Sequence, residues 1–308
     1  MLWEEKVRVL IFLSLIAAVY VFAVGSLVRI LLNRFGIGKF SKTAFQVWFR
    51  RIIFSLAGLG FFCFAYAYFV EPYWLSVRNV EIHSSKVKSP FRIVHISDIH
   101  SDSKPRLEER LADAIAVEKP DLIVFSGDSI NSSEGLPVFR KCLTEIAKVA
   151  PTFVVKGNWD LGTQNLFDGT GAIQLNGKME SIEIKGNKVS LIGVSAFDTF
   201  KLNDKLSNLS AENFNLFLYH LPDEIENIAN SNVDLYCAGH THGGQIALPF
   251  YGALMTLSKF DKKYEAGTFE VGKTWLNVNR GIGMEGESAP RVRFYCRPEI
   301  SVIDVLPN

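Results

Sequence analysis

Two long apolar stretches stand at the start of the chain. Residues 9–28 carry no charged side chain, and residues 52–70 form a second uncharged stretch that is rich in Phe. Each is close to the roughly 20 residues with which a helix crosses a bilayer core. A signal peptide would have a shorter apolar region and a small-residue cleavage site. We predict two transmembrane helices, in an anchor over 1–75 that precedes a globular domain over 76–308. A buried helical hairpin and a non-spanning interfacial hairpin are the alternatives.

The pattern changes in the globular part to short apolar segments that alternate with segments of helical spacing. Apolar runs over 92–97, 121–126 and 152–156 predict buried strands. Between them, apolar side chains recur every three or four residues over 107–115 and 139–146, which predicts two helices. This alternation is typical of an α/β layered domain.

The second half of the domain is richer in strands. A Lys185-Gly186-Asn187 turn between two apolar segments predicts a hairpin. The polar segment 201–212 predicts a loop, and a short helix is expected near Ile225 and Ile228. Further strands are expected at 216–219, 233–237, 267–271, 275–278, 292–295 and 300–305.

Charge narrows the class of function. The net charge is +1 and the first 70 residues carry +6, so residues 71–308 carry about −5. A mildly acidic domain lacks the basic surface of a nucleic-acid-binding protein, and we expect no nucleic-acid partner. The four cysteines have no metal-knuckle spacing, and we expect them to pack in apolar surroundings without forming a disulfide framework.

The segment between the apolar stretches, residues 29–51, holds six basic side chains and no acidic one. By the positive-inside rule this loop is cytoplasmic, which places the globular domain on the outer side. Tyr73 and Trp74 follow the second stretch and suit an interfacial aromatic belt. We therefore expect a location in the cell (inner) membrane, with the loop charge favouring an extracytoplasmic domain.

Seven side chains with metal-binding chemistry each follow a strand-like run. Ligand sites of α/β sheets lie at the carboxyl ends of strands, so we expect these side chains to converge. Their oxygen and nitrogen donors suit transition metals such as Mn, Fe or Zn. His83 and His95 are the remaining histidines and are expected to be structural. The seven candidates are Asp98, His100, Asp128, Asn158, His220, His240 and His242.

Each of these signals is weak when taken singly. Gly127-Asp128 alone is more often a turn than a ligand, and His-x-His pairs are often accidents of the surface. A metallo-β-lactamase type of site needs H-x-H-x-D-H, and the residues after His242, Gly243-Gly244-Gln245, exclude it. The specificity lies in the ordered set: D-x-H, G-D, G-N-x-[DE], a lone H, and G-H-x-H.

This ordered set resembles the calcineurin-like metallophosphoesterase family over about residues 92–305. The segments 279–283 and 297–300 resemble its membrane-associated YkuE/YaeI-type branch. The resemblance implies a four-layer α/β/β/α sandwich, phosphoester hydrolysis and two divalent ions, with Mn expected first and Fe or Zn as alternatives. It implies that Asp98, His100 and His242 hold one ion, that Asn158, His220 and His240 hold the other, and that Asp128 bridges them.

One position departs from the family motif G-N-H-[DE], because Trp159 replaces the histidine that orients the phosphate or protonates the leaving oxygen. An indole N–H donates a hydrogen bond but does not transfer a proton near neutral pH. General-acid help is worth roughly 10²–10⁴-fold and is needed least when the leaving group is a weak base. Trp159 therefore favours a phosphoanhydride over an alkyl phosphomonoester. A resemblance to the UDP-2,3-diacylglucosamine pyrophosphatases of lipid A synthesis, which also lack this histidine, points the same way.

We predict a membrane-anchored two-metal hydrolase of a lipid-linked phosphoester or phosphoanhydride, such as UDP-2,3-diacylglucosamine, which would yield UMP and a lipid phosphate. Residues 246–255, with Leu257 and Phe260, form either a lipid-facing wall or a core segment. A general envelope phosphodiesterase or phospholipid phosphoesterase and a non-catalytic scaffold are the alternatives. A nucleotide-lipid substrate requires a cytoplasmic domain, in conflict with the loop charge. The predicted catalytic residues are Asp128, Asn158 and His240, and the predicted substrate contacts are Trp159, Asp160 and Arg280.

Overall fold

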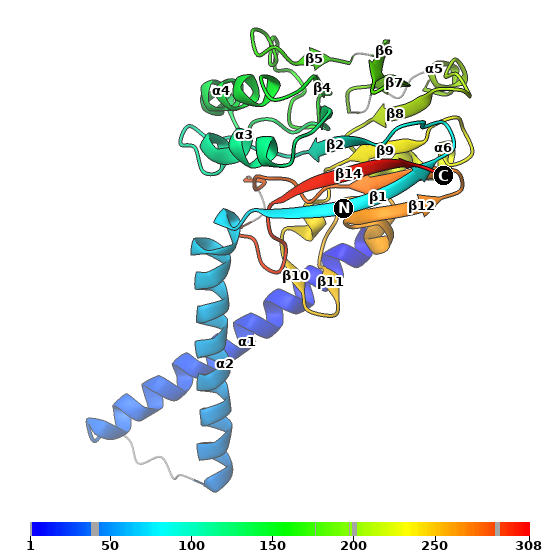
Figure 1. Cartoon of the computed structure of the whole chain (residues 1–308). Helices are drawn as coiled ribbons and strands as arrows, with labels where there is room; N and C mark the ends of the chain where they lie inside the picture. Colours follow the sequence, from blue (N-terminus) through cyan, green and yellow to red (C-terminus); the bar gives the residue numbers. More distant parts are fainter. Residues whose placement is uncertain (1, 38–42, 176, 197, 199–201, 287–289) are drawn as a thin grey trace.

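A pair of long N-terminal helices and a layered α/β domain make up the chain (Figure 1). The computed structural model describes residues 2–37, 43–175, 177–196, 198, 202–286 and 290–308. Helix α1 spans Trp3–Arg34 and helix α2 spans Ala44–Phe69. Thr43 opens α2 with a capping box, in which its hydroxyl accepts from the backbone N–H of Gln46 at 3.2 Å.

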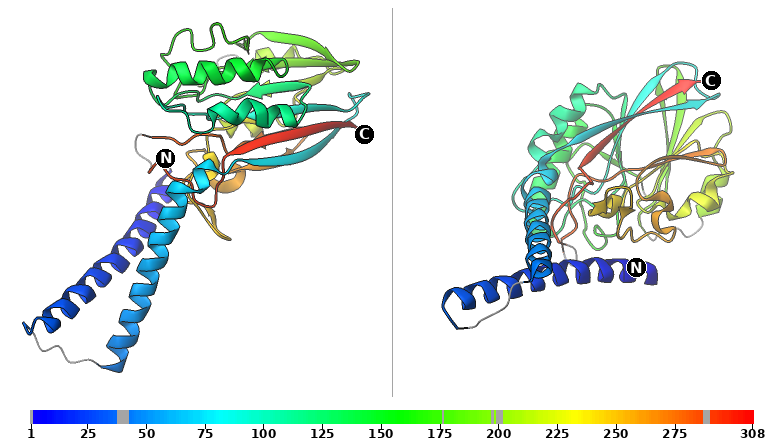
Figure 2. Two further views of the ribbon diagram at one scale, coloured as in Figure 1. Left: turned by 60° about the vertical axis from the view of Figure 1, so that its left-hand side comes forward. Right: turned by 90° about the horizontal axis from the view of Figure 1, so that it is seen from below.

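Both helices are long and apolar enough to cross a membrane and are candidate spans. They contact each other near their middles, where the Tyr20 hydroxyl donates to the Ala57 carbonyl at 3.0 Å and the rings of Phe22 and Phe49 meet edge-on. Most of their apolar side chains are exposed, which argues against a buried hairpin of a soluble domain. Figure 2 shows that the helices extend away from the domain, apart from the N-terminal end of α1.

Two six-stranded sheets form the centre of the domain. Their strand orders are β1-β14-β2-β3-β4-β5 and β12-β13-β9-β8-β7-β6. The strands of the first sheet are β1 (Ser76–Ser84), β2 (Phe91–Ile96), β3 (Leu122–Phe125), β4 (Thr152–Val154), β5 (Ile173–Gln174) and β14 (Glu299–Pro307). Those of the second are β6 (Met179–Ile184), β7 (Asn187–Gly193), β8 (Phe214–Leu218), β9 (Leu235–Ala238), β12 (Gly267–Val271) and β13 (Thr274–Val278).

Apolar side chains fill three layers and confirm the predicted α/β/β/α sandwich. One core lies between the sheets and includes Ile93, Leu216 and Leu235. The outer face of the first sheet is covered by α3 (Glu108–Val117) and α4 (Leu136–Ala147). The outer face of the second sheet packs against a third core, to which α5 (Leu202–Ser207), α6 (Ile225–Ile228) and the short helix η5 (Asp261–Tyr264) contribute.

Two local expectations were wrong or incomplete, and one strand was not predicted. The segment 201–212 contains helix α5, whose Leu202 and Leu206 are buried, and is not only a loop. Segment 292–295 is not a strand, because Phe294 makes only a single bridge to Ile246 and the Arg293 amide donates to the carbonyl of Ala67 in α2. Strand β1 escaped prediction because it is a sheet edge with several exposed polar residues.

Candidate metal centre

The predicted ligands leave the carboxyl ends of five strands, three in the first sheet and two in the second. Parallel pairing keeps these ends level: Ile96 lies beside Phe125 and Phe125 beside Val154 in the first sheet, and Leu218 lies beside Cys237 in the second. This is the edge at which α/β sheets place their ligand sites. Asp98 and His100 follow β2, Asp128 follows β3, Asn158 follows β4, His220 follows β8, and His240 and His242 follow β9.

The backbone bends sharply where it carries these ligands. Of thirteen described non-glycine residues with positive φ, five are predicted ligands, and their φ values lie between 44° and 70°. Such backbone is uncommon for residues with a side chain and tends to cluster at functional sites. The bent residues are Asp98, His100, Asp128, His240 and His242.

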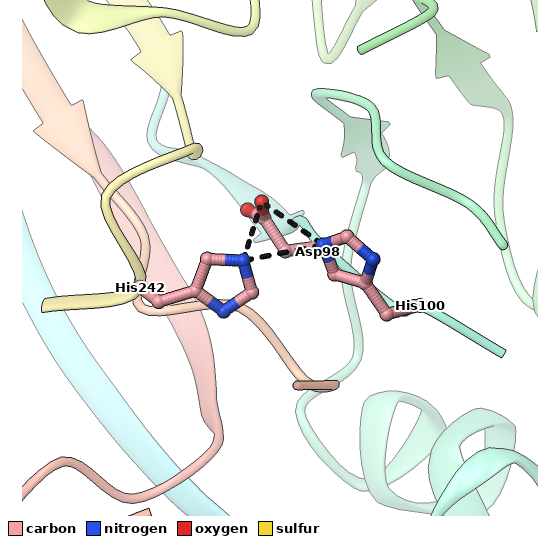
Figure 3. Close-up of side chains that lie close together, drawn as sticks. All are labelled: Asp98, His100 and His242. Atoms are coloured by element: carbon pink, nitrogen blue, oxygen red, sulfur yellow. Dashed lines mark hydrogen bonds and ion pairs between the residues drawn. The ribbon is translucent and has the colours of Figure 1, made fainter. Parts of the chain in front are cut away.

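One group of ligands consists of Asp98, His100 and His242, which are buried and point toward one another (Figure 3). The Nε2 atom of His242 lies 3.2 Å from Asp98 Oδ1 and 3.2 Å from the Nε2 atom of His100. The ligand atoms all lie within 4.8 Å of one another, so one ion could contact all three.

A second group consists of Asp128, His220 and His240, whose ligand atoms also lie within 4.8 Å of one another. His220 Nε2 is 3.0 Å from Asp128 Oδ2. The same carboxylate oxygen is 3.6 Å from Nε2 of His100, which belongs to the first group. Asp128 thus lies between the two groups, the position that a bridging ligand requires.

One buried oxygen beside the second group, Oδ1 of Asn158, has no hydrogen-bond partner among the described residues. Buried polar atoms are nearly always satisfied, and an orphan calls for an explanation such as an ion. A bound cation would satisfy this oxygen. The donors of the two groups fit two divalent ions, and the amide oxygen of Asn158 is a further donor of the kind such ions take.

Electrostatics at the site favour cation binding. Burial lowers the pKa of His100 and of His240 to about 4, so both rings are neutral at pH 7 and keep the lone pair that a metal ligand needs. Burial also opposes protonation of His220, but Asp128 and Asp98 outweigh burial and raise its pKa to about 9. Burial likewise opposes ionisation of Asp98, yet the imidazoles of His242 and His220 lower its pKa. The carboxylates of Asp98 and Asp128 thus favour a positive charge beside them, and a bound cation would supply one.

Two glycines of the motifs lie against the carboxylates. A Cβ atom at Gly157 would lie 2.1 Å from Asp128 Oδ1, and one at Gly239 would lie 2.2 Å from Asp98 Oδ2. Both distances are shorter than any real contact, so a side chain at either position would displace a ligand. The glycines are needed for close approach of backbone and carboxylate.

Two imidazoles are oriented by oxygen atoms of neighbouring residues. Nδ1 of His220 lies 2.9 Å from the Ser126 carbonyl, and Nδ1 of His100 lies 3.0 Å from Oδ1 of Asn131. Donation of the ring proton to such an acceptor leaves the opposite nitrogen free to bind a metal. Asn131 also donates to the carbonyls of His100 and Met284, so it ties the first group to the loop after β13.

Sequence reasoning missed Arg293, whose side chain is fully buried behind His242. Its guanidinium donates to the carbonyls of Gly283, Arg280 and Cys296, and Nη2 lies 3.4 Å from Nδ1 of His242. A lone arginine in a polar segment gives no signal of burial, and Asn131 is similarly inconspicuous. Only the packed structure identifies these two supports.

The predicted substrate contacts have different positions. The Trp159 ring is partly exposed and meets the His100 ring edge-on at 5.5 Å, while its backbone N–H donates to Asp128 Oδ1 at 2.9 Å. Trp159 thus borders the site, and its contact with a substrate stays a prediction.

Asp160 requires correction as a substrate contact, whereas Arg280 as a substrate contact stays a prediction. The Asp160 carboxylate is fully buried and accepts from the backbone N–H groups of Gly157, Asp128 and Ser129, so it positions the loops that carry ligands. Arg280 lines a separate pocket with Tyr295 and Cys296.

A pocket of about 240 Å³ opens beside the metal groups. His240 and His242 line one part of it, and apolar residues of the following segment, among them Ile246, Leu254 and Leu257, line another. A further part of the wall comes from α1, whose Val9, Phe12 and Leu13 reach the same space. The N-terminal helix is therefore part of the site, which the sequence did not indicate.

The chain was compared with known protein families, proteins and structures. Residues 91–244 match the family model of the calcineurin-like phosphoesterases. The chain is 32% identical to the metallophosphoesterase YkuE of Bacillus subtilis, over 78% of this chain and 88% of that protein. It is 30% identical to the phosphodiesterase YaeI of Escherichia coli, over 79% and 93%. The purple acid phosphatase PPD1 of yellow lupin is similar in structure, with a TM-score of 0.39 and 13% identity over 68% of this chain and 46% of that one.

The family uses a two-ion site, and six of the seven predicted ligands come together here in two adjoining groups. Membership rests on both the matched domain and the relatives at 30% identity or more. The chain belongs to the calcineurin-like phosphoesterase family and is a metal-dependent phosphohydrolase.

Proposed function

We propose that this enzyme hydrolyses a lipid-linked phosphoanhydride or phosphoester at the membrane, with UDP-2,3-diacylglucosamine as the leading substrate and UMP and a lipid phosphate as products. The observation that carries the proposal is the shared pocket, in which two predicted metal ligands and the apolar side chains of an anchor helix line the same space. Residues 1–75 then serve as anchor and residues 76–308 as the catalytic domain.

The roles of the ligands follow from their grouping. Asp98, His100 and His242 would hold one ion, and Asn158, His220 and His240 the other, with Asp128 between them. Bound divalent ions would activate water and stabilise charge on the phosphoryl oxygens. We propose Mn as the native metal because the oxygen and nitrogen donor set suits it, although the same set also accepts Fe or Zn.

Trp159 supports the choice of an anhydride. Its ring borders the first group of ligands, where the family histidine would stand, and its indole N–H can only donate a hydrogen bond. Without a proton donor at this position, a leaving group that departs as a weak base is favoured. The phosphate released from a pyrophosphate meets that condition, and an alkoxide does not.

The apolar wall supports a lipid-linked substrate. Val9, Phe12 and Leu13 lie on the helix that continues as a candidate membrane span, and they face the pocket together with Leu254 and Leu257. An acyl chain could pass along α1 from the bilayer to the pocket while staying in contact with apolar surface, which avoids the cost of hydrating it. The phosphoryl group would then lie near His240 and His242.

Replacing Leu13 with Trp is expected to obstruct the pocket and to raise KM for UDP-2,3-diacylglucosamine about tenfold. Turnover of bis(p-nitrophenyl) phosphate, a small soluble diester, should change less than twofold. Leu10→Trp is the matched control, because Leu10 is an exposed residue of the same helix that does not line the pocket. The measurement is steady-state kinetics of the purified full chain in detergent, over a panel that also contains phosphomonoesters and phospholipids.

The panel also separates the alternatives. Preferred turnover of a phospholipid would replace the nucleotide lipid with an envelope phosphodiester, in agreement with the activity in the name of YaeI. Equal effects of Leu13→Trp on acylated and soluble substrates would remove the acyl-chain role of the pocket.

The side of the membrane is a separate test. A nucleotide-lipid substrate requires that a reporter fused after Asn308 is active in the cytoplasm, whereas the six basic residues between the helices favour the opposite side. Cytoplasmic reporter activity is the expected result for UDP-2,3-diacylglucosamine. Extracytoplasmic activity would exclude that substrate and would leave an envelope lipid phosphoester in its place.

A further inference from the structure

A fully buried carboxylate, Glu5, stands in the first turn of α1. Its Oε1 atom accepts from the backbone N–H of Thr256 at 2.7 Å, from the Thr256 hydroxyl at 3.1 Å and from the backbone N–H of Leu257 at 3.0 Å. A buried charge persists only when it is well hydrogen-bonded, so this contact fixes the start of α1 and residues 256–257 relative to each other.

Leu257, whose backbone N–H donates to Glu5, is also a neighbour of a predicted metal ligand. The carbonyl of Leu257 lies 3.4 Å from Nε2 of His240, and Leu257 has a positive φ of 58°. A leucine does not adopt this conformation readily, so it needs support from its surroundings. Glu5 supplies that support on the N–H side of the residue, while the carbonyl side faces His240.

We propose that Glu5 is a positioning residue for the metal centre, acting through Leu257 on His240. The carboxylate holds the Leu257 backbone, the Leu257 carbonyl accepts the Nε2 proton of His240, and Nδ1 of the same ring is left to bind the ion of the second group. The inference rests on the proposed role of His240 as a ligand. It makes the first turn of the anchor helix a working part of the metal site.

Arg8 offers a matched control within the same helix face. Its guanidinium pairs with both carboxylate oxygens of Asp261 and donates to the Leu254 carbonyl at 3.2 Å. It therefore docks α1 on the domain as Glu5 does, but it contacts neither Thr256 nor Leu257. Loss of docking alone should affect both variants, whereas loss of positioning should affect only Glu5.

The test measures Mn²⁺ binding to the full-length protein in detergent by titration calorimetry, together with kcat and KM. Glu5→Ala is expected to weaken one of the two ions about 10–100-fold, the usual effect of removing an outer support of a ligand, and to lower kcat with KM little changed. Glu5→Gln keeps an oxygen that can accept from Leu257 and should recover most of the affinity. Arg8→Ala should bind both ions within about threefold of the unaltered protein.

A double variant identifies which ion is affected. If Glu5 acts through His240, adding Glu5→Ala to His240→Ala should weaken Mn²⁺ binding no further. Wild-type affinity in Glu5→Ala, or an equal loss in Arg8→Ala, would overturn the positioning role while leaving the proposed function intact. Absence of Mn²⁺ binding by the unaltered protein would instead overturn the metal assignment itself. Should Glu5→Ala fail to fold, Glu5→Met takes its place, because methionine keeps the length of the side chain but has no oxygen to accept from Leu257, and the same loss of Mn²⁺ affinity is expected.

Discussion

Asp128→Asn is expected to reduce phosphodiester turnover to background and to leave at most one bound ion per chain. Asp128 lies between the two ligand groups, 3.0 Å from Nε2 of His220 and 3.6 Å from Nε2 of His100. The change removes the negative charge that both groups share and puts an amide NH₂ where an oxygen donor is needed. Metal content by mass spectrometry and turnover of bis(p-nitrophenyl) phosphate with added Mn²⁺ measure the two effects.

Asp168→Asn is the control for this variant, because Asp168 is an exposed carboxylate of the same domain. It should retain both ions and full turnover. Near-normal turnover of Asp128→Asn would contradict the assignment of Asp128 as the shared ligand. Loss of turnover with both ions retained would instead place Asp128 in another step of the reaction.

The second large effect concerns the leaving group. Trp159→His restores the family residue beside His100, where the tryptophan ring now lies at 5.5 Å. We expect kcat for an alkyl phosphomonoester to rise by roughly 10²-fold, the lower end of the usual benefit of a general acid. Turnover of a pyrophosphate should change far less, because its leaving phosphate needs little protonation. Parallel assays of both substrates at several pH values measure the difference.

Trp159→Phe separates proton donation from shape. Phenylalanine retains an aromatic ring against His100 but has no proton to give, so it should not raise monoester turnover. A gain in Trp159→Phe equal to that in Trp159→His would mean that the smaller ring merely admits the substrate. No gain in either variant would show that Trp159 does not determine the choice of leaving group.

The layered fold and the convergence of the ligands were accessible from sequence for a physical reason. Buried parallel strands are short apolar runs, and the polar residues at their carboxyl ends meet at one edge of a sheet. The runs ending before Asp98, Asp128 and Asn158 could therefore be aligned without knowing any long-range contact. His95 was also recognised correctly as a core residue, since its ring bonds Asn277 and Ser126 inside the domain.

Other parts of the site depend on contacts between distant segments and left no local pattern. Asp160 occupies a motif position next to Trp159, yet its carboxylate turns inward to bind backbone N–H groups. The burial of Arg293 and the positive φ of Leu257 are set by packing and not by neighbouring residues. Glu5 looked like an ordinary charge flanking an apolar helix until its distant partner, Thr256, was known.

The docking of both helices bears on how the enzyme should be prepared for study. Glu71, just after α2, accepts from the backbone N–H groups of Tyr295 and Cys296, and the Cys296 thiol donates to the His242 carbonyl at 2.7 Å. Trimming the protein to residues 76–308 for solubility would remove this carboxylate along with Glu5. Each loss removes the acceptor that holds a backbone segment close to a predicted metal ligand. The full chain, with both helices, is therefore the form to assay, and we expect a fragment over residues 76–308 to be less active.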